Sequence, residues 1–212
     1  MKQIMHKARL LAAIALTLIV CGCASTQKLS EVDRAKFKTA RINQTVQKGQ
    51  LFLLAPSGAN VGLIFGAIGG AAASGSIADT QKSFTDFLDK NSLSIEKIVR
   101  EEFEKALKES GKLAIAGPEE SSAPVINISV PQYGFGVTHL LSSNVVPVIQ
   151  VKCDLVDSSA KLIWSENERM LPSIASPMQS TTWAQLHDDP KQIEEQWRKA
   201  SRILVKKIID TL

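Results

Sequence analysis

This 212-residue chain contains only three histidines and three cysteines, so it has few imidazole bases and thiol nucleophiles. His139 is followed by Ser142 and Ser143, which places an imidazole close to two hydroxyls in the sequence. A hydrolase also needs an acid that orients the base, and the linear sequence supplies none beside them. The nearest approach to a phosphate-binding loop is Gly134-Phe135-Gly136, which lacks the third glycine and fits a bend in a strand better. We therefore expect a protein that is not an enzyme.

Metal-binding and redox chemistry have equally little support. His187, Asp188 and Asp189 are consecutive and would offer three ligands, but a helix that begins at Asp189 explains this residue more simply, as an N-cap. Cys153 lies in an alternating apolar pattern, so we expect it inside the core. The sequence therefore predicts no catalytic residues, no metal site, no cofactor and no small-molecule substrate.

The first 22 residues have the pattern of a cleaved export signal. Residues 1–9 are positively charged, and residues 10–20 form an apolar run that is too short to span a bilayer. The sequence Val20-Cys21-Gly22-Cys23 follows and resembles the bacterial lipobox, with a branched apolar residue three positions before the cysteine and a small residue directly before it. The resemblance implies a signal peptide that ends at residue 22 and fatty-acyl chains, palmitate among them, on Cys23. Cys21 is a rival acceptor, but Val20 in front of it is bulky.

The same resemblance implies a location. Lipoproteins of this kind are typically retained in the inner membrane by an aspartate directly after the acceptor cysteine, and Ala24 follows here instead. We therefore expect sorting to the outer membrane, with the domain in the periplasm. Within residues 23–35, the polar stretch 24–35 lacks apolar periodicity and is typical of a tether. The acyl chains hold such a domain at the membrane because each buried methylene contributes roughly 0.8 kcal/mol.

The charge balance argues against a nucleic-acid partner. The formal net charge is +4 at pH 7. Removal of residues 1–22 takes away Lys2, Lys7 and Arg9 and no acidic residue, which leaves about +1. No basic stripe of the kind that binds nucleic acid is present in the remainder.

Residues 36–212 predict a single periplasmic domain. Short strand-like stretches at 37–45 and 50–54 precede a helical region at 79–111, whose apolar stripe includes Ile98, Val99 and Phe103. Gly111 ends that region. Further strands are expected at 112–116 and 123–134, followed by a hairpin of 148–156 and 161–166.

The last helix has the clearest pattern. Asp189 is its expected N-cap, Pro190 suits the first helical position, and Gln192 completes a box-like pairing. An apolar stripe runs from Ile193 through Trp197 to Ile208. The order of elements predicts an α+β fold, with helices packed on one face of a mostly antiparallel sheet.

This arrangement resembles that of small periplasmic lipoproteins such as the activators of penicillin-binding proteins and the N-terminal part of the curli-secretion lipoprotein. The stretches that carry the resemblance are EEFEKALKESGKLAIA (101–116) and VKCDLVDSSAKLIW (151–164). It is a resemblance of architecture, and no functional residues are carried over from it.

A glycine-zipper segment at 61–78 reads VGLIFGAIGGAAASGSIA, with Gly62, Gly66 and Gly70 at four-residue spacing. On a helix these glycines would line one edge and let a second backbone approach closely. Three interpretations are open. The segment packs against its own domain, it forms an assembly or partner surface, or it contacts the membrane.

Trp183 is the remaining candidate, because it follows a stretch rich in proline, serine and methionine. It is either a partner contact or a residue folded over the core. We expect a lipid-anchored cell-envelope protein with a non-catalytic binding or assembly role, whose partners are the membrane and either another envelope protein or copies of itself. The alternative is a self-assembling, membrane-contacting subunit, such as a pore or secretion component, that uses the glycine-rich segment.

Overall fold

The computed structural model describes residues 26–54, 77–117, 119–139, 141–173 and 176–212. From the N-terminus, its elements are α2 (Glu31–Lys36), β1 (Thr39–Ile42), β2 (Gln47–Leu54), α4 (Ile77–Lys90), α5 (Ile95–Ser110), β3 (Ala114–Ile115), β4 (Val125–Val137), β5 (Asn144–Val156), β6 (Leu162–Met170), β7 (Thr181–Thr182), α6 (Trp183–Asp188) and α7 (Lys191–Asp210). The α+β class is confirmed, and β1 to β6 overlap the predicted strand stretches, whereas β7 was not predicted.

The sheet is mixed, and the prediction of a mostly antiparallel sheet was wrong. Its described strands follow the order β3-β1-β4-β5-β6, with β2 also on β4 and β7 on β5. The predicted hairpin is confirmed, since β4, β5 and β6 pair antiparallel. However, β1 and β2 both pair parallel with β4, and β3 pairs parallel with β1. The physical reason is the helical crossover: α4 and α5 intervene, and a chain that returns through helices re-enters a sheet in the parallel direction.

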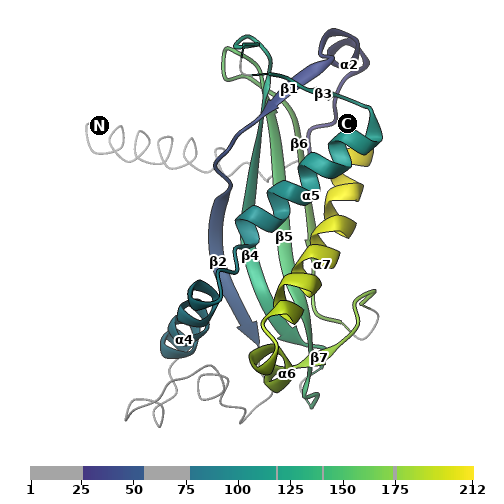
Figure 1. Ribbon diagram of the computed structural model, residues 1–212. Helices are drawn as coiled ribbons and strands as arrows, with labels where there is room; N and C mark the ends of the chain where they lie inside the picture. Colours follow the sequence, from purple (N-terminus) through teal and green to yellow (C-terminus); the bar gives the residue numbers. More distant parts are fainter. Residues whose placement is uncertain (1–25, 55–76, 118, 140, 174–175) are drawn as a thin grey trace, which may run out of the picture.

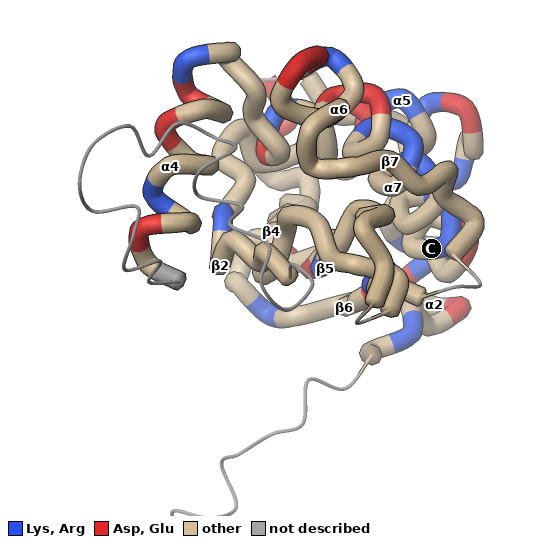
Figure 2. The backbone as a smooth tube through the Cα atoms, turned by 90° about the horizontal axis from the view of Figure 1, so that it is seen from below, with Lys and Arg blue, Asp and Glu red and all other residues tan. Residues whose placement is uncertain are grey.

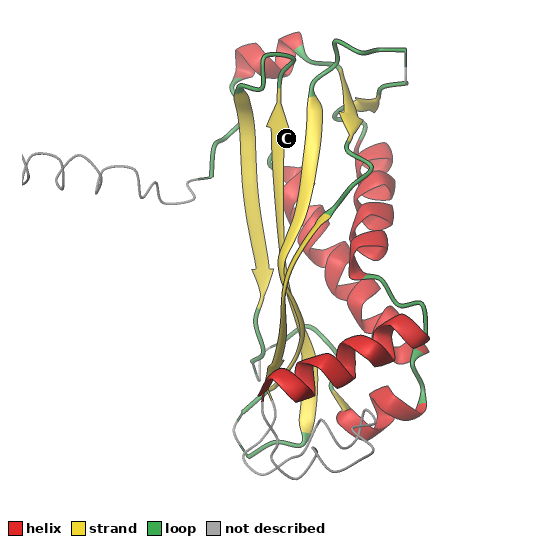
Figure 3. Ribbon diagram, turned by 90° about the vertical axis from the view of Figure 1, so that its left-hand side faces the viewer, coloured by secondary structure: helices red, strands yellow, loops and turns green. Residues whose placement is uncertain are grey.

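The helices cover one face of this sheet, as predicted. Figure 1 shows α5 and α7 packed side by side along the strands, and Figure 3 shows the opposite face without them. The helical region expected at 79–111 is two helices, separated at Ser92, whose φ is 56°. Gly111 caps α5 in the left-handed conformation, as its position predicted.

The start of the last helix differs by one residue from the expectation. The N-cap of α7 is Pro190, without a side-chain cap. Asp189 lies just before it, and its carboxylate accepts a hydrogen bond from the backbone N–H of Lys191 at 3.2 Å. A capping box is present instead on α6, where Thr182 and Gln185 exchange hydrogen bonds.

The N-terminal part of the described chain pairs with the edge strand β6 within the stretch 24–35, which was predicted to be a tether. Gln27 forms a bridge with Ser165 of β6, with backbone hydrogen bonds of 2.9 and 3.0 Å. Its side chain donates to the carbonyl oxygen of Ile163, and Leu29 is buried. The described chain is therefore already held to the sheet at Gln27, through both its backbone and its side chain.

A buried carboxylate joins α5 to α7. Glu102 is 4% exposed and accepts hydrogen bonds from Arg198 at 3.2 Å and from Arg202 at 3.0 Å. Burial by itself raises the pKa of the Glu102 carboxyl, but the hydrogen bonds from the two arginines outweigh burial, so that its pKa lies below the usual value. Ionised Glu102 therefore stabilises the folded state.

We predict that Glu102→Gln lowers the free energy of unfolding at pH 7 by about 1–3 kcal/mol, because it removes a charged acceptor that two arginines share. The folded pKa is depressed, so this stabilisation is present above the unfolded pKa, roughly 4.3, and is lost as the pH falls through the lower folded value. Urea unfolding at pH 7, 5 and 3 measures it. The control is Glu109→Gln on the same helix, where the carboxylate is 67% exposed; equal losses in both variants would refute the role of Glu102.

Candidate functional site

One end of the sheet is built from three stretches of sequence that contain no Asp, Glu, Lys or Arg. They are residues 49–78, 121–151 and 170–187. In this section the uncharged end means the described parts of these stretches that close the sheet: Leu54, the β4–β5 turn at 138–143 and the loop that follows β6 from residue 171. Figure 2 looks along the molecule from this end, and most charged positions lie on the helices around it.

The strand register brings the three stretches together. The last residue of β2, Leu54, is paired with Gly136 of β4. Pro172, two residues past the end of β6, lies against Gly136, where it would contact a Cβ at 3.0 Å. β7 then pairs with the start of β5 through Thr181 and Val145. Segments far apart in the sequence therefore meet around one pair of strands.

Three leucines are exposed at this uncharged end. Leu141, in the β4–β5 turn, is 93% exposed, Leu171 is 48% exposed and Leu54 is 36% exposed. The opposite end of the sheet is charged: it carries α2, with Glu31, Asp33 and Lys36, and the β5–β6 turn. Charge is thus distributed unevenly along the strands, whereas exposed apolar side chains occur at both ends: Val32 on α2 is 77% exposed and Leu162 at the start of β6 is 38% exposed.

A hollow of about 240 Å³ lies among the loops of this end, lined mainly by neutral hydrogen-bonding groups that include Thr138, His139, Ser142, Asn144 and Ser176. Several hydroxyl groups that line it form hydrogen bonds with neighbouring groups of the same loops. Thr138 donates to Ser142 Oγ at 3.2 Å, and Ser142 Oγ accepts from the backbone N–H of Asn144 at 3.0 Å. No carboxylate lines the described part of this hollow, so the structure brings His139 and Ser142 together without the acid that a hydrolytic triad requires.

Trp183 belongs to the core beneath this end, which was one of its two interpretations. It is 4% exposed and packs edge-on against Phe84 and Phe135, with ring centroids 6.3 and 6.1 Å away. Phe135 in turn stacks on Trp197. Trp183 therefore supports the uncharged end from within the core.

The other reactive residues also have structural surroundings. Cys153 is fully buried on β5, as expected of a core residue, and burial raises the pKa of its thiol. His187 stacks on Phe87 of α4 at 5.5 Å, and its Nδ1 lies 3.1 Å from the carboxylate of Asp188. Within the described ranges, no group of three or more His, Cys, Asp or Glu could hold a metal ion.

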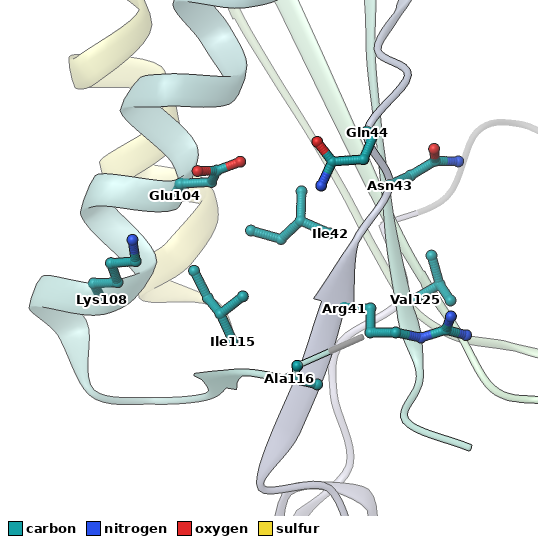
Figure 4. Close-up of a pocket in the computed structure, with 10 residues that line it drawn as sticks. Arg41, Ile42, Asn43, Gln44, Glu104, Lys108, Ile115, Ala116 and Val125 are labelled. Atoms are coloured by element: carbon teal, nitrogen blue, oxygen red, sulfur yellow. The ribbon is translucent and has the colours of Figure 1, made fainter. Parts of the chain in front are cut away.

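A second hollow, of about 570 Å³, lies near the charged end between α5 and strands β1, β3 and β4. In Figure 4, Glu104 and Lys108 of α5 lie across from Ile42 and Ile115, while the Arg41 side chain extends to the other side of its strand. Glu104 is engaged by Arg100 at 3.7 Å. The lining mixes opposite charges with aliphatic groups and includes no histidine, serine or cysteine, so size alone does not make it a reaction centre.

Two of the candidates predicted from sequence lie outside the described residues. These are Cys23 and residues 61–76 of the glycine-zipper segment, with Gly62, Gly66 and Gly70; the last two residues of that segment, Ile77 and Ala78, begin α4. No helix among the described residues is long and apolar enough to cross a membrane. The exposed leucines were missed because the local sequence does not show which leucines the fold leaves uncovered; Leu54, for example, ends the apolar run LFLL of β2. The signal that could have found them is the absence of charge in all three stretches.

The described residues thus define an α+β domain with a mixed sheet, helices on one face and a polarised pair of ends. Its solved neighbours include a PelC dodecamer from Paraburkholderia phytofirmans, at 13% identity over 89% of this chain and 94% of that chain, with a TM-score of 0.39. Protein XCC0632 from Xanthomonas campestris, of family DUF330, is 15% identical over 82% of this chain and 92% of that chain, with a TM-score of 0.36. No family model and no curated protein matches the chain.

Proposed function

We propose that this chain is a lipid-anchored cell-envelope protein with a non-catalytic binding or assembly role, attached through acylated Cys23 to the outer membrane. The sequence support is the lipobox-like Val20-Cys21-Gly22-Cys23 behind an apolar run of signal-peptide length. The surface that would do the binding is the uncharged end, where Leu141, Leu171 and Leu54 are exposed on stretches that carry no charge of their own.

The docking of Gln27 on β6 carries this proposal. Its two backbone hydrogen bonds with Ser165 fix the start of the domain only four residues beyond Cys23. A chain of four residues spans at most about 14 Å when fully extended. A lipid on Cys23 would therefore hold the domain directly on the membrane surface, whereas a tether of residues 24–35 would let it reach much further.

Native mass spectrometry of the detergent-extracted protein tests both parts of the proposal. We expect a mature chain that begins at Cys23, carries acyl chains, and is a monomer or small oligomer with or without a co-purifying protein. An unmodified chain, or one that still holds residues 1–22, would refute the lipid anchor.

The second candidate is a self-assembling subunit that contacts the membrane, for which the glycine spacing at 62, 66 and 70 is the specific observation. Gly66→Leu fills the edge along which backbones would meet. We predict that the wild-type protein is then a large closed ring, and that Gly66→Leu reduces it to smaller species without lowering its urea midpoint. A Gly66→Leu chain that unfolds would instead indicate that the segment packs on its own domain.

A further inference from the structure

We infer that the uncharged end is a second membrane-contacting surface, in which Leu141, Leu171 and Leu54 enter the interface of a lipid bilayer. The inference deepens the proposed function, but the surface itself is defined by residues of the folded domain and does not depend on a lipid at Cys23. The three leucines lie at the end of β2, in the β4–β5 turn and directly after β6, which the strand register brings to one end of the sheet.

The side chains that would enter the bilayer are exposed and have a rigid base. Leu141 is the most exposed large apolar residue described, at 93%. Its turn is braced by Ser142, whose backbone N–H donates to the carbonyl of His139 at 2.9 Å and whose hydroxyl contacts Thr138. Beneath the turn, Phe135 and Trp183 are buried in the core. Insertion of these leucines therefore requires no rearrangement of the domain.

The absence of charge favours a lipid surface over a protein as the occupant. A protein interface ordinarily has a polar rim, and arginine is enriched in it. A bilayer excludes charged side chains more strongly than a protein interface does, because any charged side chain carried into it must be desolvated. Here the described parts of three separate stretches lack charged residues where they meet, including the polar hollow, which is lined by hydroxyls, amides and His139. Exposed charges lie nearby on α4, where Lys82 and Asp86 form an ion pair with each other beside β2. Neutral hydrogen-bonding groups beside exposed leucines suit the boundary between headgroups and acyl chains.

Combined with the proposed lipid at Cys23, this surface fixes the orientation of the domain. Ser165, which binds Gln27, lies opposite Asp154, and β5 runs from Asp154 back to Asn144 over about 33 Å at roughly 3.3 Å per residue. The link from Cys23 to Gln27 spans at most about 14 Å. The lipid at Cys23 and the leucines of the uncharged end can reach the same bilayer only if the strands lie within about 25° of the plane of the membrane. The domain would therefore lie along the membrane.

Flotation of the unlipidated chain 24–212 with phosphatidylcholine vesicles tests the surface, since the described core begins at Leu29. We expect the chain to float with neutral vesicles, with little change between 0.1 and 0.5 M salt, because no charge takes part. Leu141→Asp should weaken the partitioning at least tenfold, and Leu171→Asp should weaken it less. The matched control is Val32→Asp, an apolar residue 77% exposed on α2 at the charged end, which should bind as the wild type does.

The outcomes separate this inference from the proposed function. No flotation of the wild-type chain, unchanged flotation of Leu141→Asp, or an equal loss in Val32→Asp each overturns the membrane-contacting surface and leaves the lipid at Cys23 untouched. An oligomer that Leu141→Asp dissociates, in a chain that does not bind vesicles, would show that the surface binds a second copy instead. Circular dichroism and urea midpoints of all three variants exclude misfolding as the cause.

Discussion

Gly134→Ala is expected to lower the free energy of unfolding by about 3 kcal/mol or more. Gly134 has a φ of 141°, a backbone conformation that side chains rarely adopt, which costs about 1–3 kcal/mol. In addition, a Cβ at this position would overlap the backbone carbonyl oxygen of Phe52 on β2. Backbone atoms of a paired strand cannot rotate away, so β2 must separate from β4.

Gly111→Ala is the matched control for this result. Gly111 also has a positive φ, of 64°, but nothing lies within 4 Å of its added Cβ. That variant should lose only the conformational cost, about 1–2 kcal/mol. Urea unfolding of both variants isolates the contact between β2 and β4, and equal losses would contradict it. Since Leu54 ends β2, hydrogen exchange in Gly134→Ala should also show weakened protection along that strand.

Cys23→Ser will abolish the incorporation of labelled palmitate, an all-or-none effect, if Cys23 is the lipid acceptor. A serine hydroxyl does not replace the thiol that the lipobox resemblance requires for acylation. Cys153 offers no substitute, because its thiol is buried and burial raises its pKa. Autoradiography of cells grown with labelled palmitate gives the measurement.

Cys21→Ser is the control, since Cys21 lies two residues away and is the rival acceptor. It should incorporate palmitate at the wild-type level. Loss of label in Cys21→Ser with retention in Cys23→Ser would move the acceptor to Cys21 and the start of the mature chain with it. Label retained in both variants would refute a lipobox at this position.

The helices and strands could be predicted from sequence because their signals are local. The alternation of Ile149, Val151, Cys153 and Leu155 gave the buried face of β5, and all four are fully buried. Residues such as Ile98 and Phe103 gave the inner face of α5 in the same way. A side-chain period depends only on the backbone conformation of its own segment, so it is visible without knowledge of the partner.

The direction of β1 and β2 could not be predicted in this way. Alternation does not distinguish a strand that pairs parallel from one that pairs antiparallel, and β2 is separated from β4 by two helices. Trp183 shows the same limit. Its polar neighbours suggested exposure as readily as burial, and only the convergence of Phe84 from α4 and Phe135 from β4 covers it.

The sequence by itself determined the positions of the main elements, the absence of charge in three stretches and the lipobox-like pattern at Cys23. Only the tertiary structure decided that the described parts of these stretches meet at one end of a mixed sheet, that Leu141 is exposed there while Trp183 is buried beneath it, and that Gln27 pairs with β6. The physical reason is the difference between local and long-range interactions. Periodicity and composition are properties of a single segment, whereas the way distant segments come together depends on the hydrogen-bonded register between strands far apart in the chain.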